Sequence, residues 1–311
     1  MRRVDATDEL ELVKNAALPP PGIVCEGKIV RANRRLNLFS IGVPMLGTLA
    51  AIASLSSLGV SVTTLVVFAC FFILNAWGLG IGLHRYFTHH AFKTSKTFER
   101  VLAVLGSISF QGPIDRWVAD HRRHHRYTDC AWDTHSPYWR GSQPIARRMH
   151  GLLHAHMGWM WHAHVSSTAR YAPEITPNTV AGWTSRHYGA ICIAGIITPA
   201  VVGYLVSGAD EALRCALWAG FVRVTLLHHL TWSINSIGHC FGTQVARARD
   251  ESRNNVFLTF LLLGEGLHST HHKFPTAGTK GEPWKDWNGA LLLALERAGV
   301  IWNLRRHGAI N

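Results

Sequence analysis

Four long apolar runs alternate with polar segments along this chain. They occupy residues 38–58, 60–83, 188–207 and 211–234. Each is about 20 residues long, which is the length a helix needs to cross the hydrocarbon core of a membrane. The first two are separated so briefly that they predict a tight helical hairpin. The pattern therefore predicts an all-α membrane protein with four transmembrane helices.

The fourth run is less uniformly apolar than the other three. Four basic residues interrupt it: Arg214, Arg223, His228 and His229. An ionisable side chain inside a span usually faces the bundle interior or a cavity, so we expect inward-facing positions here. Arg214 lies near one end of the run, where a long side chain can instead extend toward the membrane surface.

The charge distribution predicts an orientation in the membrane. Only 16% of the residues are charged, against about 25% in soluble proteins, and the net charge is +12. Basic residues concentrate in 1–37 and 84–187, whereas the turn GADE between the last two runs is short and acidic. The positive-inside rule then predicts a multi-pass protein with both termini in the cytoplasm.

This orientation divides the chain into a cytosolic lead-in, residues 1–37, and a membrane domain, residues 38–311. It also places every histidine-rich segment on the cytosolic side, at or beyond the ends of the spans. The basic charge comes with no nucleic-acid-binding motif, so we expect membrane lipid and not nucleic acid as a partner.

Histidines cluster at a spacing that favours metal binding. Nine of the 20 histidines, drawn from four short segments, are candidate ligands: His84, His89, His121, His124, His125, His239, His268, His271 and His272. Two segments share the pattern H-x-x-H-H, which on a helix places three imidazoles on one side. The first and last can bind one ion, and the middle one can reach a neighbouring ion. Nine imidazoles suit two ions, so we expect a dinuclear metal site in a cytosolic helical cap.

A metal transporter or metal sensor is the alternative from another functional class. Transporters place their ligands near the bilayer midplane on interrupted helices. The histidine segments of this chain lie instead at or beyond the predicted span ends, which favours an enzyme.

The histidine segments resemble those of the membrane fatty acid desaturases of the stearoyl-CoA desaturase type. HRYFTHH, WVADHRRHH, TWSINSIGH and GEGLHSTHHKFP follow one another in the family's order, and the resemblance covers residues 60–305. It implies an oxygen-dependent oxidoreductase that inserts a cis double bond into a long-chain fatty acyl substrate. The family's commonest product has this bond at the ninth carbon (Δ9). Hydroxylation of an alkyl chain on the same scaffold is the alternative, and the residues flanking the histidines favour desaturation.

The resemblance also implies two iron ions and divides the ligands between them. One iron takes His84, His89, His121, His125 and His271. The other takes His124, His239, His268 and His272, with Asn235 acting through a water molecule.

Further residues are candidates to support this site. Three carboxylates flank the histidine segments and suit hydrogen bonds from ligating imidazoles: Asp120, Asp133 and Glu265. Thr231 and Trp232 resemble residues that line the acyl tunnel in the family. Arg140 suits the phosphate of an acyl carrier, because the guanidinium group matches phosphate geometry.

The acyl carrier and the electron donor stay open at this point. Coenzyme A, acyl carrier protein and intact glycerolipid all fit the sequence. The chain contains neither the H-P-G-G motif of cytochrome b5 nor a C-x₄-C-x₂-C ferredoxin run. We therefore expect a separate ferredoxin or cytochrome b5, steered by the basic cytosolic face.

Overall fold

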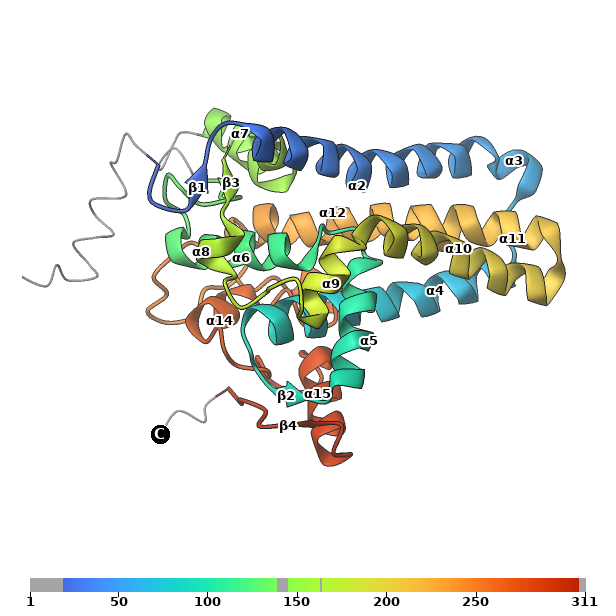
Figure 1. Ribbon diagram of the computed structural model, residues 1–311. Helices are drawn as coiled ribbons and strands as arrows, with labels where there is room; N and C mark the ends of the chain where they lie inside the picture. The colour runs from blue at the N-terminus through green and yellow to red at the C-terminus, as the bar shows by residue number, and fades with distance from the viewer. Residues whose placement is uncertain (1–18, 139–144, 163, 308–311) are drawn as a thin grey trace, which may run out of the picture.

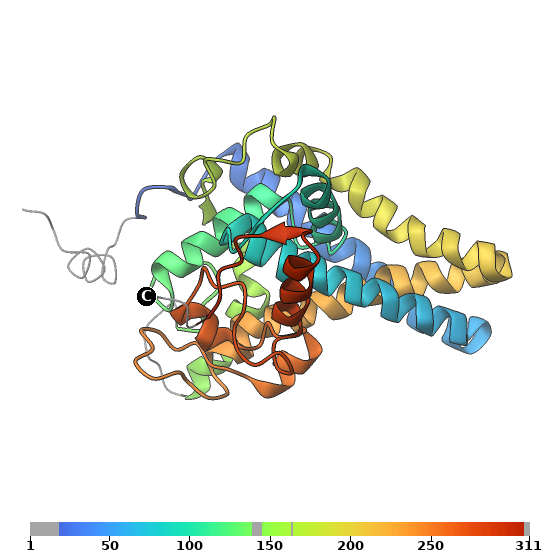
Figure 2. The ribbon, with the colours of Figure 1, turned by 90° about the horizontal axis from the view of Figure 1, so that it is seen from below.

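Long apolar helices run side by side and project from a broader helical region (Figures 1 and 2). The computed structural model describes residues 19–138, 145–162 and 164–307. The long helices are α2 (Lys28–Ala53), α4 (Val62–Trp77), which continues as the π-helix η1 (Gly78–Thr88), and α10 (Tyr188–Ser207). Within the described residues, three helices are long and apolar enough to cross a membrane: 28–53, 62–88 and 188–207.

These three helices correspond to the first three predicted runs, with shifted boundaries. α2 begins at Lys28, ten residues before the expected span, because the polar stretch before residue 38 is also helical. The short helix α3 (Leu55–Leu58) makes the turn toward α4. Ser61 caps α4, since its side chain accepts a hydrogen bond from the backbone N–H of Thr64.

The fourth predicted run is helical but is not one of these three apolar helices. It forms α11 (Ala209–Cys215), the π-helix η3 (Ala216–Val222) and α12 (Arg223–Ser236), which pack against the other long helices. Arg223 is fully buried there and donates hydrogen bonds to Asn75 and to the carbonyl of Ala219. His228 is also buried, against the carbonyl of Phe110. Both face inward, as expected of ionisable groups in a bundle.

The remaining described parts of 84–187 and 237–307, which we call the cap, gather at one end of the long helices (Figure 1). Its helices are α5 (Lys96–Ser107), α6 (Ile114–Tyr127), α7 (Ile145–His156), η2 (Gly158–Trp161), α8 (Thr168–Tyr171), α9 (Val180–Arg186), η4 (Ile237–His239), α13 (Val256–Leu261), α14 (His268–Lys273) and α15 (Trp287–Arg297). Two antiparallel strand pairs complete it: β1 (Ile23–Val24) with β3 (Val165–Ser166), and β2 (Lys93–Thr94) with β4 (Ile301–Trp302).

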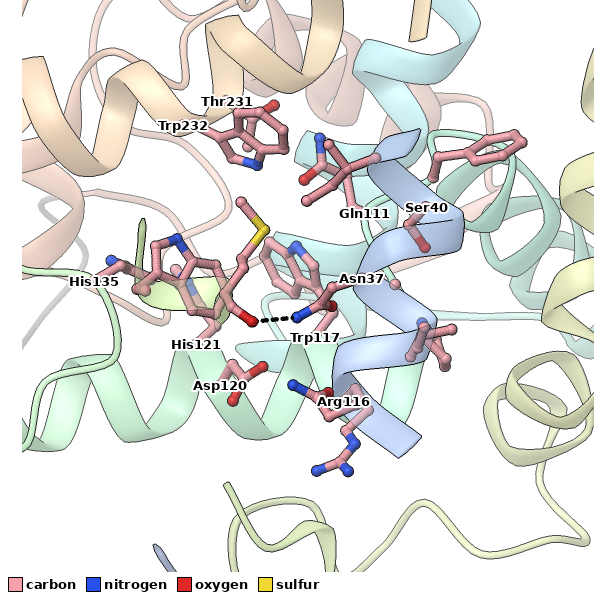
Figure 3. A pocket seen from close by; sticks show the side chains of 18 of the residues that line it. Asn37, Ser40, Gln111, Arg116, Trp117, Asp120, His121, His135, Thr231 and Trp232 are labelled. Carbon is pink, nitrogen blue, oxygen red and sulfur yellow. Dashed lines mark hydrogen bonds between the residues drawn. The ribbon is translucent and has the colours of Figure 1, made fainter. Parts of the chain in front are cut away.

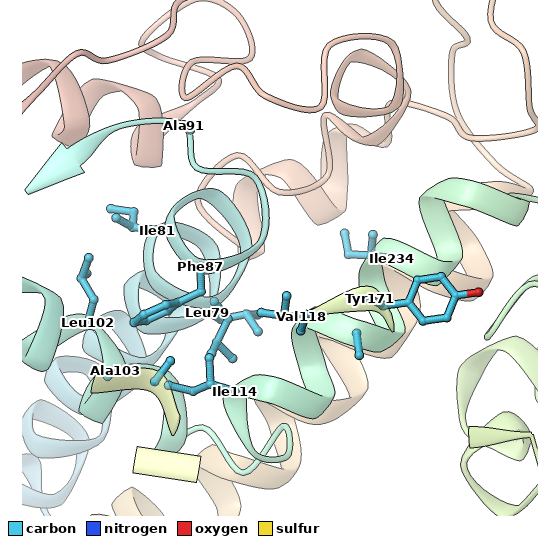
Figure 4. Close-up of a cluster of buried hydrophobic side chains, with 14 of the residues drawn as sticks. Leu79, Ile81, Phe87, Ala91, Leu102, Ala103, Ile114, Val118, Tyr171 and Ile234 are labelled. Carbon is cyan, nitrogen blue, oxygen red and sulfur yellow. The ribbon is translucent and has the colours of Figure 1, made fainter. Parts of the chain in front are cut away.

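The main hydrophobic core lies where the long helices enter the cap (Figure 4). Leu79 and Leu83 of η1 pack there with Ile114 and Val118 of α6, and all four are buried. This core fixes η1 against α6, and these two elements carry the first two histidine segments.

The outer surface of the long helices is apolar. Val62, Leu65 and Leu205 are all more than half exposed. An exposed apolar surface on this scale is typical of helices that face lipid.

Candidate metal centre

Five histidines from three elements converge on one point in the cap. They are His84 and His89 from the end of η1, His121 and His125 from α6, and His271 from α14. The Nε2 atoms of His84 and His271 lie 3.0 Å apart, and those of His125 and His271 lie 2.8 Å apart. His121 lies 3.0 Å from His125 and 3.1 Å from His89, again between Nε2 atoms. We call these five residues group one.

Four further histidines converge beside group one. Nε2 of His239 in η4 lies 3.0 Å from Nε2 of His268, and Nε2 of His124 lies 3.2 Å from Nε2 of His272. The His239 and His272 rings also meet, with centroids 5.3 Å apart. We call these four residues group two, and their ligand atoms are close enough together to hold one ion.

The helical spacing explains how each H-x-x-H-H segment serves both groups. His121 and His125 are one helical turn apart on α6, so both reach group one. His124, next to His125 in sequence, points to group two, and the two ring centroids are 5.6 Å apart. α14 repeats the arrangement with the groups exchanged. Each group brings together the histidines that the family resemblance assigns to one iron, and their role as iron ligands stays a prediction.

The geometry of both groups fits a metal ion better than it fits hydrogen bonds. Two metal–imidazole bonds of about 2.1 Å at a right angle place their nitrogen atoms about 3.0 Å apart, close to the separations seen here. Several Nδ1 atoms face carboxylates and so carry the imidazole proton. In the His124–His272 pair both Nδ1 atoms face carboxylates, so the two Nε2 atoms present lone pairs to each other, and a metal cation satisfies this arrangement. Imidazole donors suit iron.

Four carboxylates orient the imidazoles through their Nδ1 atoms. Glu265 contacts His84 at 2.5 Å, and Asp133 contacts His124 at 2.8 Å. Both were among the three candidates from the sequence. Two partners were missed: Asp129 lies 3.1 Å from His239, and Asp250 lies 2.8 Å from His272.

Chain folding, and not sequence spacing, brings the missed carboxylates to their histidines. Asp129 is 110 residues from His239, and Asp250 is 22 residues from His272. The third candidate, Asp120, has a different place, because its carboxylate accepts a hydrogen bond from Ser166 at 2.5 Å. Asp129 has φ +59°, a left-handed conformation uncommon for a residue other than glycine.

Glu265 is the centre of a buried charge network. Besides His84, its carboxylate accepts hydrogen bonds from Arg85 at 2.9 Å, Lys280 at 2.7 Å and Asn288 at 2.9 Å. Burial alone would raise the pKa of the Glu265 carboxyl, but Lys280, Arg85 and His84 outweigh it and hold this pKa well below its usual range. Glu265 is therefore ionised and holds His84 with Nδ1 protonated and Nε2 free.

Burial also keeps the histidines of α14 in the form that binds metal. It lowers the pKa of His268 and of His271 well below the ordinary value, and neighbouring basic groups add to the effect. For His272, burial outweighs the opposing effect of Asp250 and lowers the pKa to about 4. All three rings are neutral at pH 7, as ligation requires.

A cavity leads from group one toward the long helices (Figure 3). His121 and Trp117 line it on the cap side, with their rings stacked at a centroid distance of 4.9 Å. The predicted substrate residues Thr231 and Trp232 line it from α12, one turn before Asn235, which also contributes to the wall. Arg140 lies outside the described residues.

The opposite wall of this cavity belongs to α2, which the sequence did not single out. Asn37 and Ser40 line it, and Nδ2 of Asn37 donates a hydrogen bond of 2.7 Å to the carbonyl of Met160 (Figure 3). Asn33, Leu36, Asn37, Ser40 and Ile41 of α2 therefore line the same cavity as Trp117 and His121 of α6. No motif in the sequence signals this contact, because it depends on the packing of α2 against η2.

Comparisons with known proteins agree with this arrangement. A family model described as fatty acid desaturase matches residues 61–286. The chain is 36% identical to a hex-5-enoyl-[acyl-carrier protein] acetylenase of Moorena producens over 267 residues, which is 85% of this chain and 83% of the relative. It is 29% identical to an sn-1 stearoyl-lipid 9-desaturase of Anabaena variabilis, covering 70% of this chain and 74% of the relative.

A probable acyl-CoA desaturase of Schizosaccharomyces pombe is 29% identical, and the match covers 79% of this chain and 49% of that longer protein. These relatives act on acyl groups held by different carriers, so the shared feature is the fatty acyl chain. The family match spans more than half of the chain and includes both histidine groups. This protein is a member of the fatty acid desaturase family, oxidoreductases that act on fatty acyl chains.

Proposed function

We propose that this protein is an oxygen-dependent, di-iron desaturase that inserts a cis double bond into a long-chain fatty acyl substrate, at the ninth carbon. One observation carries the proposal: two groups of convergent imidazoles lie side by side, and His121 of group one lines a cavity between α2, α6 and α12. Group one and group two would each hold one iron, and Asn235 would reach the second iron through a water molecule.

The chain's own residues position the substrate beside the site. His121 belongs to group one and also lines the cavity, so an acyl chain in the cavity passes directly beside the ligands. Trp117 stacks on His121 and forms an apolar surface for the methylenes. When bound, the irons would supply the activation of O₂ needed to remove hydrogen from two adjacent methylenes. The protein's contribution is to select which carbon–carbon bond lies there.

The carrier end of the substrate would lie at a second cavity, which opens at the surface. The two cavities share Asn33, Leu36, Pro113 and Arg116. Arg116 and Arg186 line this entrance, and arginine suits the phosphate of coenzyme A or of a carrier-protein arm. A glycerolipid headgroup would use the same entrance.

Membrane placement and electron supply complete the proposal. The long helices would insert in the membrane with both termini and the metal centre on the cytoplasmic side, as the basic charge distribution predicts. Electrons would come from a separate ferredoxin or cytochrome b5.

A second candidate reaction follows from the similarity to the acetylenase of Moorena producens. The same site would remove two hydrogens from an existing alkene and so form a triple bond. This reaction needs an alkenyl chain on an acyl carrier protein instead of a saturated chain.

Gas chromatography–mass spectrometry of total fatty acids tests the proposal. A desaturase-deficient host would express the chain together with a ferredoxin and its reductase. His121→Ala removes a group one ligand, and His187→Ala changes an exposed histidine outside both groups.

We expect a new monounsaturated acid with the wild type and with His187→Ala, and none with His121→Ala. Fragmentation then locates the double bond. Acetylenic products from a supplied alkenoic acid would establish the second reaction. Hydroxylated chains, or no product despite bound iron and a working donor, would contradict desaturation.

A further inference from the structure

A cavity of about 600 Å³ lies on the side of group two, away from the residues that line the acyl cavity. Its wall includes residues 247–250 before α13 and His272 to Pro275 at the end of α14. Three exposed basic residues, Arg247, Arg249 and Lys273, contribute to this wall. We call these three residues the basic patch.

The cavity reaches the metal centre through a single histidine. His272 lines it and contacts Asp250 through Nδ1 at 2.8 Å. On the other side of the same ring, Nε2 lies 3.2 Å from Nε2 of His124 within group two. The His272 side chain is only 3% exposed, so the ring closes the cavity off from the metal centre while touching both.

The charge of this cavity is strongly basic. Among its lining residues, the acid is Asp250, whose carboxylate is already engaged by His272 and by Ser252. The basic patch is therefore not neutralised by that carboxylate. A cavity with this charge favours an acidic partner, because complementary charge steers association.

A neighbouring cavity beside group one has a different charge balance. His89 and His125 line it, but its Arg122 forms an ion pair of 2.6 Å with Glu174. Only Arg305 adds further fixed positive charge among the residues that line it. The side of group two is consequently the better match for an acidic protein.

The loop that carries Arg247 and Arg249 is held in place by backbone hydrogen bonds. The backbone N–H of Val245 donates to Ser269 at 3.1 Å, and that of Arg253 donates to the carbonyl of Gly238 at 2.7 Å. Arg247 has φ +58°, a left-handed conformation that costs backbone energy for any residue except glycine. Such strain persists where surrounding contacts enforce it, and it is often found at functional sites.

We propose that the basic patch is the docking surface for an acidic one-electron donor protein, which reduces the metal centre by way of His272. The inference rests on the proposed function. Each docking event would oxidise the donor by one electron, and the irons that the two histidine groups would hold would accept that electron. Two events, together with two protons, one O₂ and the two hydrogens removed from the acyl chain, give one double bond and two waters.

Direct binding tests the proposal without depending on activity. The purified full chain would be titrated with an oxidised plant-type [2Fe–2S] ferredoxin and, separately, with a soluble cytochrome b5 domain, at two ionic strengths. The test variant combines Arg247→Glu, Arg249→Glu and Lys273→Glu, and a second variant replaces the same three residues by Gln. Arg297→Glu is the matched control, since Arg297 is exposed on α15 and is not among the residues that line this cavity.

We expect the charge-reversed variant to bind the donor at least about tenfold more weakly and to lose most of the salt dependence. The Gln variant should fall between it and the wild type, and Arg297→Glu should match the wild type within about twofold. The ratio of ferredoxin-driven to dithionite-driven reduction rates should fall in the same order, and this ratio corrects for differences in iron content.

Several results would overturn the docking surface. Equal donor binding by the charge-reversed variant and the control would do so, as would failure of the wild type to bind either donor. Loss of binding to anionic-lipid nanodiscs with donor binding intact would assign the patch to lipid instead. Failure of dithionite-reduced protein to make product would count against the proposed function, whereas the binding data would still decide the docking surface.

Discussion

Glu265 is the position at which one substitution should disturb both stability and metal binding. Glu265→Gln keeps the size of the side chain and removes its charge. In the wild type, the carboxylate contacts His84, Arg85, Lys280 and Asn288 at 2.5–2.9 Å. The amide loses acceptor capacity, and it leaves Lys280 without its anionic partner in a fully buried place.

The loss of folding stability expected for Glu265→Gln follows from these contacts. Removing one member of a buried ion pair typically costs about 3–5 kcal/mol. Burial already lowers the pKa of Lys280 to about 8, so this lysine can lose its proton once the carboxylate is gone. Arg85 also keeps Asp286, at 2.7 Å. We therefore expect the lower end, about 3 kcal/mol, which corresponds to a fall in melting temperature of roughly 6–12 °C.

The loss of the His84 contact should weaken metal binding as well. Removing the hydrogen-bond partner of a ligating histidine typically lowers metal affinity about 10–100-fold. Differential scanning fluorimetry in detergent and iron analysis after dialysis against a weak chelator measure the two effects. The control is Glu296→Gln, a carboxylate near the surface that pairs with Arg306. Equal melting temperature and iron retention in the two variants would refute the assigned role of Glu265.

The remaining predictions concern individual ligands and the cavity. His124→Ala should reduce bound iron from about two ions to one per chain, because His124 reaches only group two. Elemental analysis measures this iron content, and an unchanged content would contradict the assignment of His124 to group two. Gly80→Ala should destabilise by about 1–3 kcal/mol in thermal unfolding, since a Cβ there would lie 2.3 Å from Nδ2 of Asn288. Iron retention should fall as pH drops, first through protonation of His239, whose pKa is raised because the effect of burial is outweighed by Asp129, and at lower pH through protonation of His272, whose pKa burial lowers to about 4. Trp232→Ala should widen the acyl cavity and shift the chain lengths of the products in gas chromatography; an unchanged profile would exclude Trp232 as a cavity determinant.

Apolar run length and histidine spacing predicted much of this protein. Three apolar runs correspond to three helices of membrane-spanning length, since helix length in a bilayer is a local property of composition. The fourth run was expected to be a further span. It is helical, but Arg223, His228 and His229 interrupt its apolar character, and it is not among the helices in the described residues that are long and apolar enough to cross a membrane. Its packing with the other long helices includes hydrogen bonds from Arg223 to Asn75 on α4 and to the carbonyl of Gly195 on α10, and hydropathy does not detect such partners.

The metal site also combines features that the sequence predicts with features that depend on the fold. The H-x-x-H-H spacing was enough to indicate which histidines act together, because the periodicity of a helix decides which side chains share a face. The spacing also separated His124 from His121 and His125 before any tertiary contact was considered. By contrast, Asp129 and Asp250 carry no such signal, and Asp120, which sits next to a histidine segment, contacts Ser166.

The sequence by itself predicted most elements of this protein and the histidines that converge in the two groups, since both depend on residues within a few helical turns of one another. Only the tertiary structure decided which carboxylate orients which histidine, that α2 forms a wall of the acyl cavity, and that a basic cavity ends at His272. These features join residues far apart in the chain. Their physical origin is the packing of long helices against the cap, which brings four separate histidine segments and their charged partners to the same end of the molecule.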